Sequence, residues 1–184
     1  MSRLPRAWLL GTLVMGALFA VPGDAPAQPS EVKPVDVGRT LPDVKMAGLN
    51  GPDRRLSSYR GKNLIINVWA SWCGPCRAES ASLERLAWGD AGSRFVIVGV
   101  STDDYRDAAL KWLQRSNATL NHYIDSKLEL ENLLGASHIP LTVLVDPQGR
   151  VVARFHGARE WDSADSVQLI ERAYAEFKRK GAGR

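Results

Sequence analysis

Residues 63–76 read NLIINVWASWCGPC, in which an almost unbroken apolar run leads directly into two cysteines. The apolar part, Asn63–Ala70, predicts a central β-strand that is covered on both faces. The residues that follow predict a helix over Pro75–Trp88, because apolar side chains recur there at helical spacing and proline is favoured in a first turn. The two cysteines therefore stand where a buried strand passes into a helix.

Strands and helices alternate along the rest of the chain. Leu41–Leu49 and Arg54–Leu56 flank a Gly/Pro turn and predict a β-hairpin before the central strand. The segment Asp146-Pro147-Gln148-Gly149 predicts a turn between the last two strands. Further strands are expected at Phe95–Val100, Leu120–Ile124, Leu141–Val145 and Val151–His156, and helices at Asp104–Arg115, Leu128–Leu134 and Ser163–Lys178. This order favours an α/β sandwich with a mixed central β-sheet flanked by helices and an N-terminal β-hairpin extension.

The composition is that of one ordinary globular domain. The 184 residues are 45% hydrophobic and 24% charged, which excludes disorder, collagen or coiled coil as the main architecture. The net charge of +4 comes from mixed charges over most of the chain, so we expect no binding of nucleic acid. Both cysteines lie in one motif, which excludes a disulfide framework.

The first 27 residues predict a secretory signal peptide. Arg3 and Arg6 precede Ala7–Val21, an uncharged and mostly apolar run, and Ala25-Pro26-Ala27 forms a cleavage signature. The alternative is an uncleaved N-terminal anchor, for which this run is short compared with the ~20 residues of a membrane span. Either way we expect the protein outside the cytoplasm, where disulfides persist. Residues 28–37 are expected to be a linker, 38–180 the folded domain and 181–184 a disordered tail.

Cys73 and Cys76 are the candidate redox pair. Two intervening residues let one helical turn bring the sulfurs within bonding range. Cys73 falls at the helix N-terminus, where free N–H groups and the helix dipole favour a thiolate, so we expect it to attack a target disulfide. Cys76 lies one turn further on, should be more buried, and is expected to resolve the mixed disulfide. Gly74 and Pro75 between them are candidate substrate-binding residues.

Other uses of the two cysteines fit the sequence less well. Covalent haem attachment needs a histidine after the second cysteine, and Arg77 stands there. A closed zinc site needs four ligands, but His122, His138 and His156 are 16 and 18 residues apart, far from the usual spacing of roughly three to five. An inert disulfide across so short a loop would add little stability. We expect no metal and no other cofactor.

Residues 67–79, NVWASWCGPCRAE, resemble the active-site segment of the TlpA/ResA-like branch of the thioredoxin superfamily. Residues 41–43 (LPD), 56–62 (LSSYRGK) and 139–150 (IPLTVLVDPQGR) are similar to the same branch, and the similarity spans roughly residues 36–178. The resemblance implies a thioredoxin-like fold and a periplasmic, often membrane-tethered, thiol–disulfide oxidoreductase.

The resemblance also implies roles for single residues. Pro140 matches a cis-proline that faces the cysteines, and the backbone of Ile139 would pair with a substrate strand. Glu79 matches an acidic residue beneath the cysteines, which would tune the second thiol or accept its proton. Asn67 stands where thioredoxins proper carry a buried acid, and Trp72 is expected on the docking surface. Four further tryptophans are expected to be packing residues, namely Trp69, Trp88, Trp112 and Trp161.

The dipeptide Gly74-Pro75 bears on the direction of electron flow. Thioredoxins proper carry it and are reductants near ~−270 mV, against ~−120 mV for the oxidant DsbA. The expected substrates are disulfides in exported proteins such as apocytochromes c or copper-site proteins, with electrons from a membrane thiol transporter, as the resemblance implies. Leu141 weakens a role in cytochrome maturation, because members with that role often carry glutamate there. A periplasmic disulfide oxidase or isomerase and a copper-binding thiol chaperone remain as alternatives.

Overall fold

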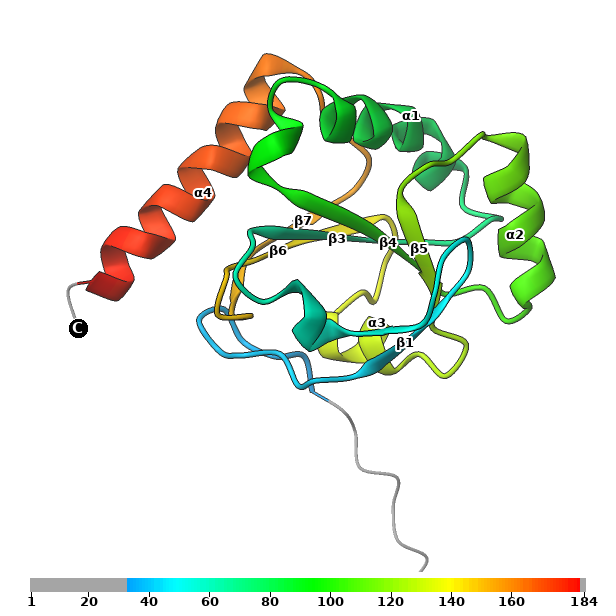
Figure 1. Cartoon of the computed structure of the whole chain (residues 1–184), viewed down its shortest axis with the longest axis horizontal. Helices are drawn as coiled ribbons and strands as arrows, with labels where there is room; N and C mark the ends of the chain where they lie inside the picture. The colour runs from blue at the N-terminus through cyan, green and yellow to red at the C-terminus, as the bar shows by residue number, and fades with distance from the viewer. Residues whose placement is uncertain (1–32, 183–184) are drawn as a thin grey trace, which may run out of the picture. The chain divides into compact units, whose positions relative to one another are not determined.

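The computed structural model describes residues 33–182, so the predicted signal peptide or anchor lies outside the described residues. Within that range seven strands form one mixed sheet in the order β2-β1-β5-β4-β3-β6-β7 (Figure 1). The three central neighbours β3, β4 and β5 are parallel, and the remaining pairs are antiparallel. The strands are β1 (Lys45–Gly48), β2 (Arg54–Arg55), β3 (Leu64–Trp69), β4 (Val96–Ser101), β5 (Asn121–Ile124), β6 (Leu141–Val145) and β7 (Val151–His156).

Helices cover both faces of this sheet. The α-helices are α1 (Gly74–Trp88), α2 (Arg106–Arg115), α3 (Glu129–Leu134) and α4 (Ala164–Ala182), and short 3-10 turns lie at η1 (Leu56–Tyr59) and η2 (Gly92–Arg94). Figure 1 shows α1 and α4 over one face and α3 over the other. The predicted α/β sandwich is confirmed.

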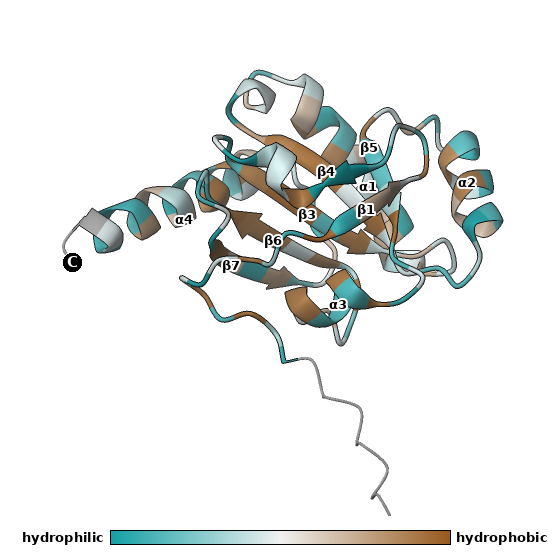
Figure 2. Ribbon diagram, turned by 60° about the horizontal axis from the view of Figure 1, so that its bottom comes forward, coloured by the Kyte–Doolittle hydropathy of each residue, from teal (hydrophilic) through white to brown (hydrophobic). Residues whose placement is uncertain are grey.

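The central strand β3 is buried on both faces, as its apolar sequence predicts. Its side chains alternate, so Leu64, Ile66 and Val68 pack with α3, whereas Ile65 packs with α1 and α4. Figure 2 shows the hydrophobic colour concentrated on β3, β4 and β6. The same alternation places Asn67 on the face covered by α1.

The hairpin and the chain ends differ in detail from the prediction. The hairpin is formed by β1 and β2, and β1 also pairs with β5, so the hairpin is part of the sheet. The expected linker docks at its end, because the N–H of Val35 donates to the carbonyl of Leu133 at 2.9 Å. The expected tail is wrong for Gly181 and Ala182, which lie in α4. This helix continues because Phe177 still packs against the core and lies beneath the Arg150 guanidinium.

The tryptophans divide into buried and exposed ones. Trp69, Trp112 and Trp161 are buried as expected. Trp88 is 75% exposed, so the expectation that it packs is wrong; its ring N–H donates to the Thr119 hydroxyl at 2.7 Å. Within residues 33–182 no helix has both the length and the apolar character needed to cross a membrane.

Candidate active site

The cysteines lie at the junction of β3 and α1. Cys73 and Cys76 form a disulfide with an S–S distance of 2.03 Å. Cys73 is the N-cap of α1, and its Sγ accepts a hydrogen bond from the N–H of Cys76 at 3.2 Å. Pro75 fills the first turn, where the missing N–H leaves no helical hydrogen bond unmade. The expected position of Cys73 at the helix N-terminus is therefore the observed one, and it favours the thiolate of this residue.

The two cysteines differ less in their exposed fraction than expected. Cys73 is 5% and Cys76 is 3% exposed, so both are buried in the disulfide form. Their surroundings differ more clearly. Cys73 Sγ lies 3.9 Å from the carbonyl oxygen of Ile139, whereas Cys76 lines a cavity beneath α1. Cys73 thus faces the loop before β6, and Cys76 faces the interior.

The loop before β6 carries the predicted cis-proline. The bond between Ile139 and Pro140 is cis, and Pro140 is buried while Ile139 is half-buried. Around the sulfurs the candidate substrate-binding residues Trp72, Gly74 and Pro75 are all exposed, Trp72 to 69%. A Cβ added at Gly74 would meet nothing within 4 Å, so this part of α1 is open to a partner chain.

Glu79 lies beneath the cysteines on α1 and is only 2% exposed. Its Oε1 accepts a hydrogen bond from Asn67 Nδ2 at 2.8 Å, and its Oε2 accepts from Trp161 Nε1 at 2.9 Å and from the Arg159 N–H at 3.1 Å. Burial raises the pKa of Glu79 above its ordinary value, and the three N–H donors oppose that rise. A buried carboxyl group with a raised pKa holds its proton more firmly than an exposed one, which suits acid–base chemistry beside a thiol.

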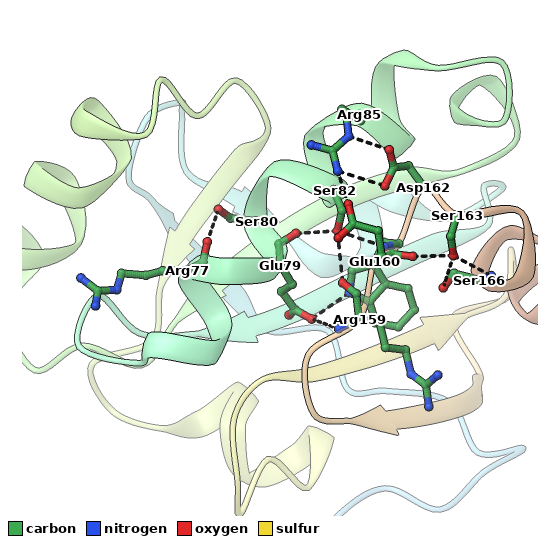
Figure 3. A network of polar contacts seen from close by, with 11 residues as sticks. Arg77, Glu79, Ser80, Ser82, Arg85, Arg159, Glu160, Asp162, Ser163 and Ser166 are labelled. Atoms are coloured by element: carbon green, nitrogen blue, oxygen red, sulfur yellow. Dashed lines mark hydrogen bonds and ion pairs between the residues drawn. The ribbon is translucent and has the colours of Figure 1, made fainter.

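Hydrogen bonds and an ion pair link the segment after β7 to α1 around this carboxyl group (Figure 3). The Ser82 hydroxyl donates to the Glu79 carbonyl at 2.7 Å and accepts from the N–H of Trp161 at 3.0 Å. At the surface Arg85 pairs with Asp162, with 2.6 Å between Nε and Oδ2. These contacts position the Trp161 indole against Glu79.

Comparison with known proteins assigns this arrangement to a family. The family model described as AhpC/TSA matches residues 37–154. The chain belongs to the AhpC/TSA family. The thiol:disulfide interchange protein DsbE of Vibrio cholerae is 31% identical over 182 residues, covering 92% of this chain and 95% of that protein. The thiol-disulfide oxidoreductase ResA of Geobacillus thermodenitrificans is 31% identical over 122 residues, covering 66% of this chain and 70% of that protein.

Solved structures agree with this assignment. The exposed lipoprotein thioredoxin Etrx1 of Streptococcus pneumoniae is similar with a TM-score of 0.63 and 25% identity, covering 71% of this chain and 99% of that chain. This member of the AhpC/TSA family is a thiol–disulfide oxidoreductase with a thioredoxin-like fold, as the TlpA/ResA-like resemblance implies.

Two residues of this oxidoreductase escaped the sequence-based prediction. Trp161 was expected only to pack, yet it donates to Glu79, and no spacing pattern could pair residues so far apart in the chain. Asp103 is 2% exposed and accepts from the N–H of Ser71 at 2.9 Å, from the Ser71 hydroxyl at 2.7 Å and from the Ser101 hydroxyl at 2.7 Å. It anchors the loop that carries Cys73. Its signal in the sequence is a run of polar residues directly after a buried strand.

Proposed function

We propose that this protein reduces disulfides in exported proteins in the periplasm, by attack of Cys73 and resolution by Cys76. The observation that carries the proposal is the Gly74-Pro75 dipeptide between the two cysteines, exposed at the start of α1. The dipeptide is that of thioredoxins, which lie on the reducing side of the potential scale. The curated relatives are named for disulfide interchange and thiol–disulfide oxidoreduction, which agrees with this chemistry.

The proposed reaction has two exchange steps. The Cys73 thiolate attacks one sulfur of the substrate disulfide, so a mixed disulfide forms and the first substrate thiolate leaves. The Cys76 thiol then loses its proton, and the thiolate attacks Cys73 Sγ, which releases the second substrate thiolate and forms the Cys73–Cys76 disulfide. Two electrons pass from the enzyme to the substrate, and the two substrate thiolates are protonated by the proton that Cys76 releases and by one proton from solvent.

The residues around the sulfurs have distinct roles in this proposal. Trp72, Gly74 and Pro75 offer an exposed surface to the substrate chain. The half-buried Ile139 lies against Cys73 and would pair its backbone with the same chain. Glu79 is one helical turn from Cys76, and its raised pKa suits it to hold a proton that the thiol gives up.

A reductant in an oxidising compartment has to be re-reduced. A membrane thiol transporter is the proposed electron donor, and the N-terminal segment is the proposed address or tether. Apocytochromes c and copper-site proteins are the proposed substrates, since both contain cysteine pairs that must be reduced before they bind haem or metal. Leu141, where cytochrome-maturation proteins often carry glutamate, weakens the specific assignment to apocytochromes c.

The reduction potential of the Cys73–Cys76 pair tests the proposal. The protein would be equilibrated in defined thiol buffers and followed by the fluorescence of Trp69 and Trp72, which lie nearest in the chain. A value near about −250 mV or lower supports a reductant, whereas a value near about −130 mV makes disulfide formation or isomerisation the better assignment. Insulin reduction by the reduced protein provides the turnover assay, with Cys76→Ser as the variant that traps the mixed disulfide. Mass spectrometry with Cu(I) would reveal a copper chaperone.

A further inference from the structure

The two carboxylate oxygens of Glu79 have unequal sets of hydrogen-bond donors. Oε2 accepts from the indole N–H of Trp161 at 2.9 Å and from the backbone N–H of Arg159 at 3.1 Å. Among the described residues, Oε1 accepts from one donor, Nδ2 of Asn67, at 2.8 Å. An ionised carboxylate offers about four lone-pair sites, two on each oxygen. Both sites on Oε2 and one site on Oε1 are therefore occupied, and the remaining site is on Oε1.

The Trp161 indole is held in place by its surroundings, so its N–H keeps this direction. The side chain is 0% exposed, and its ring meets that of Phe155 edge to face with the centroids 6.1 Å apart. The backbone N–H of Trp161 donates to the Ser82 hydroxyl at 3.0 Å, and that hydroxyl donates to the carbonyl oxygen of Glu79 at 2.7 Å. Trp161 and Glu79 are thus joined twice, once through their side chains and once through Ser82.

Asn67 is fixed in a similar way on the other carboxylate oxygen. Its Nδ2 also donates to the Thr142 hydroxyl at 3.1 Å, so both hydrogens of the amide group are used. Asn67 is 5% exposed and Thr142 is 1% exposed, and neither side chain is charged. β3 and β6 therefore present neutral, hydrogen-bonded groups at this point, and Asn67 leaves the second lone pair of Oε1 free.

We propose that Trp161 is a positioning residue, which together with the Arg159 N–H fills Oε2 and so directs the proton of Glu79 to Oε1. The inference rests on the proposed role of Glu79 as the group that takes the proton of Cys76. In that step the S–H bond of Cys76 breaks, an O–H bond forms at Oε1, and the electron pair stays on sulfur. The sulfur then attacks Cys73 Sγ, and the proton leaves Oε1 and reaches a substrate thiolate. Trp161 keeps its own proton and acts through Glu79.

The same hydrogen bond affects how firmly Glu79 holds its proton. Burial raises the pKa of Glu79, and the Trp161 indole is the foremost of the donors that oppose this rise. Asn67, the Arg159 N–H and the positive charge of the Arg159 guanidinium also lower this pKa. On α1 the titratable neighbour is Cys76, which is disulfide-bonded in the oxidised protein. The oxidised protein therefore shows the titration of Glu79 without that of the thiol.

NMR spectroscopy of the oxidised full chain tests the proposal without relying on turnover. The glutamate side chains are labelled at the carboxyl carbon, and the signal of Glu79 is identified by its absence in Glu79→Gln. Trp161→Phe removes the N–H donor and keeps a buried aromatic ring. The pKa of Glu79 is expected to rise by about one unit or more in this variant, because a hydrogen bond to the charged form is lost. Proton binding then becomes at least about tenfold tighter.

Trp112→Phe is the matched control. It makes the same chemical change in a buried indole on α2, which packs against Trp69 with the ring centroids 4.8 Å apart. Both variants lose part of a buried ring, so both are expected to unfold at a lower temperature than the wild type. The pKa of Glu79 is expected to move in Trp161→Phe and to stay unchanged in Trp112→Phe.

The pH dependence of the resolving step gives a second readout that packing alone would not move. Reduced protein is mixed with dithiobis(nitrobenzoate), an aromatic disulfide that releases one coloured thiolate when Cys73 attacks and a second when Cys76 resolves. The rate of the second release depends on removal of the Cys76 proton. Its midpoint is expected to shift to higher pH in Trp161→Phe, together with the pKa of Glu79, and to stay in place in Trp112→Phe.

The wild-type protein alone tests which oxygen binds the proton, so the proposal stays testable if Trp161→Phe does not fold. Protonation turns Oε1 into a hydroxyl oxygen, which is a weaker acceptor, whereas Oε2 becomes a carbonyl oxygen. Across the titration of Glu79, the nitrogen and proton NMR signals of the Asn67 amide are therefore expected to shift more than those of the Trp161 indole.

Two results would overturn the proposal. A larger shift at the indole than at the Asn67 amide would place the proton on Oε2. An equal pKa of Glu79 in the wild type and in Trp161→Phe would leave Trp161 as a packing residue. Failure of the wild type to release the second thiolate would instead remove Cys76 as the resolving thiol, and with it the proposed function, while the NMR titrations would still report on Glu79.

Discussion

Glu79→Gln isolates the free energy of burying one carboxyl group at the active site. Glu79 is 2% exposed, and burial raises its pKa above the ordinary value of 4.5. Between pH 4.5 and the raised pKa, the folded protein holds a proton on Glu79 that the unfolded chain has released. The wild-type free energy of unfolding therefore falls as pH rises through this window, by up to about 1.4 kcal/mol per pH unit. The fall ends once the pH exceeds the folded-state pKa.

The glutamine variant lacks this titration but keeps the packing. Its amide oxygen can accept from Trp161 and from the Arg159 N–H, as Oε2 does in the wild type. Its NH₂ group would face Asn67, whose amide can turn over to present oxygen. The stability of Glu79→Gln relative to wild type is therefore expected to rise steadily with pH across the window.

Urea unfolding of both oxidised proteins from pH 4 to pH 8, in steps of about half a unit, measures this difference. Other buried acids such as Asp125 titrate in both proteins, so their effects cancel in the difference. Glu176→Gln, at an exposed position on α4, serves as the matched control and is expected to show a flat difference. A flat or falling difference for Glu79→Gln would refute the reasoning, because burial would then not be the dominant influence on this carboxyl group.

Three further variants test the surroundings of the site. Asp103→Ala removes the acceptor of three hydrogen bonds and is expected to lower the free energy of unfolding by about 2–3 kcal/mol. It should also slow insulin reduction, because the loop that carries Cys73 loses its anchor. An unchanged rate of insulin reduction would contradict that role. Trp72→Ala should change the free energy of unfolding by less than about 0.5 kcal/mol, because this side chain is 69% exposed. It should raise KM for insulin but not for a small disulfide. Equal effects on both substrates would argue against a role of Trp72 in docking the substrate chain. Gly99→Ala places a methyl group 2.1 Å from His122 Nδ1 and should lower the free energy of unfolding by about 1–3 kcal/mol. If the variant unfolds at the same temperature as the wild type, the His122 ring moves aside freely and the prediction is wrong.

The elements of the fold were predictable because burial leaves a periodic trace in the sequence. The continuous apolar run of β3 predicts a strand that is covered on both faces, and in the structure a hydrophobic cluster covers each face. Capping positions were also visible in the sequence. Gly135 ends α3 with a positive φ of 76°, and Ser163 accepts from the N–H of Ser166 at the start of α4.

The parts that were missed depend on contacts between distant segments. Trp161 reaches Glu79 only because the chain after β7 returns across α1, and a single-residue pattern carries no record of that path. The docking of Val35 on α3 depends on backbone atoms, which every sequence supplies alike. The small difference in burial between Cys73 and Cys76 depends on the Ile139 loop, which lies against the first sulfur from outside the helix.

Helix α1 carries both the cysteine that takes part in electron transfer and the acid that can hold a proton. Its N-terminus places Cys73 where the helix dipole stabilises a thiolate. Residues 79 and 82 turn toward the segment after β7, and Cys76 precedes Glu79 by one helical turn. The acid that can store a proton and the cysteine that must release one are thus held next to each other by the same rigid element. A substitution at Glu79 should therefore alter proton transfer to Cys76 without displacing Cys73.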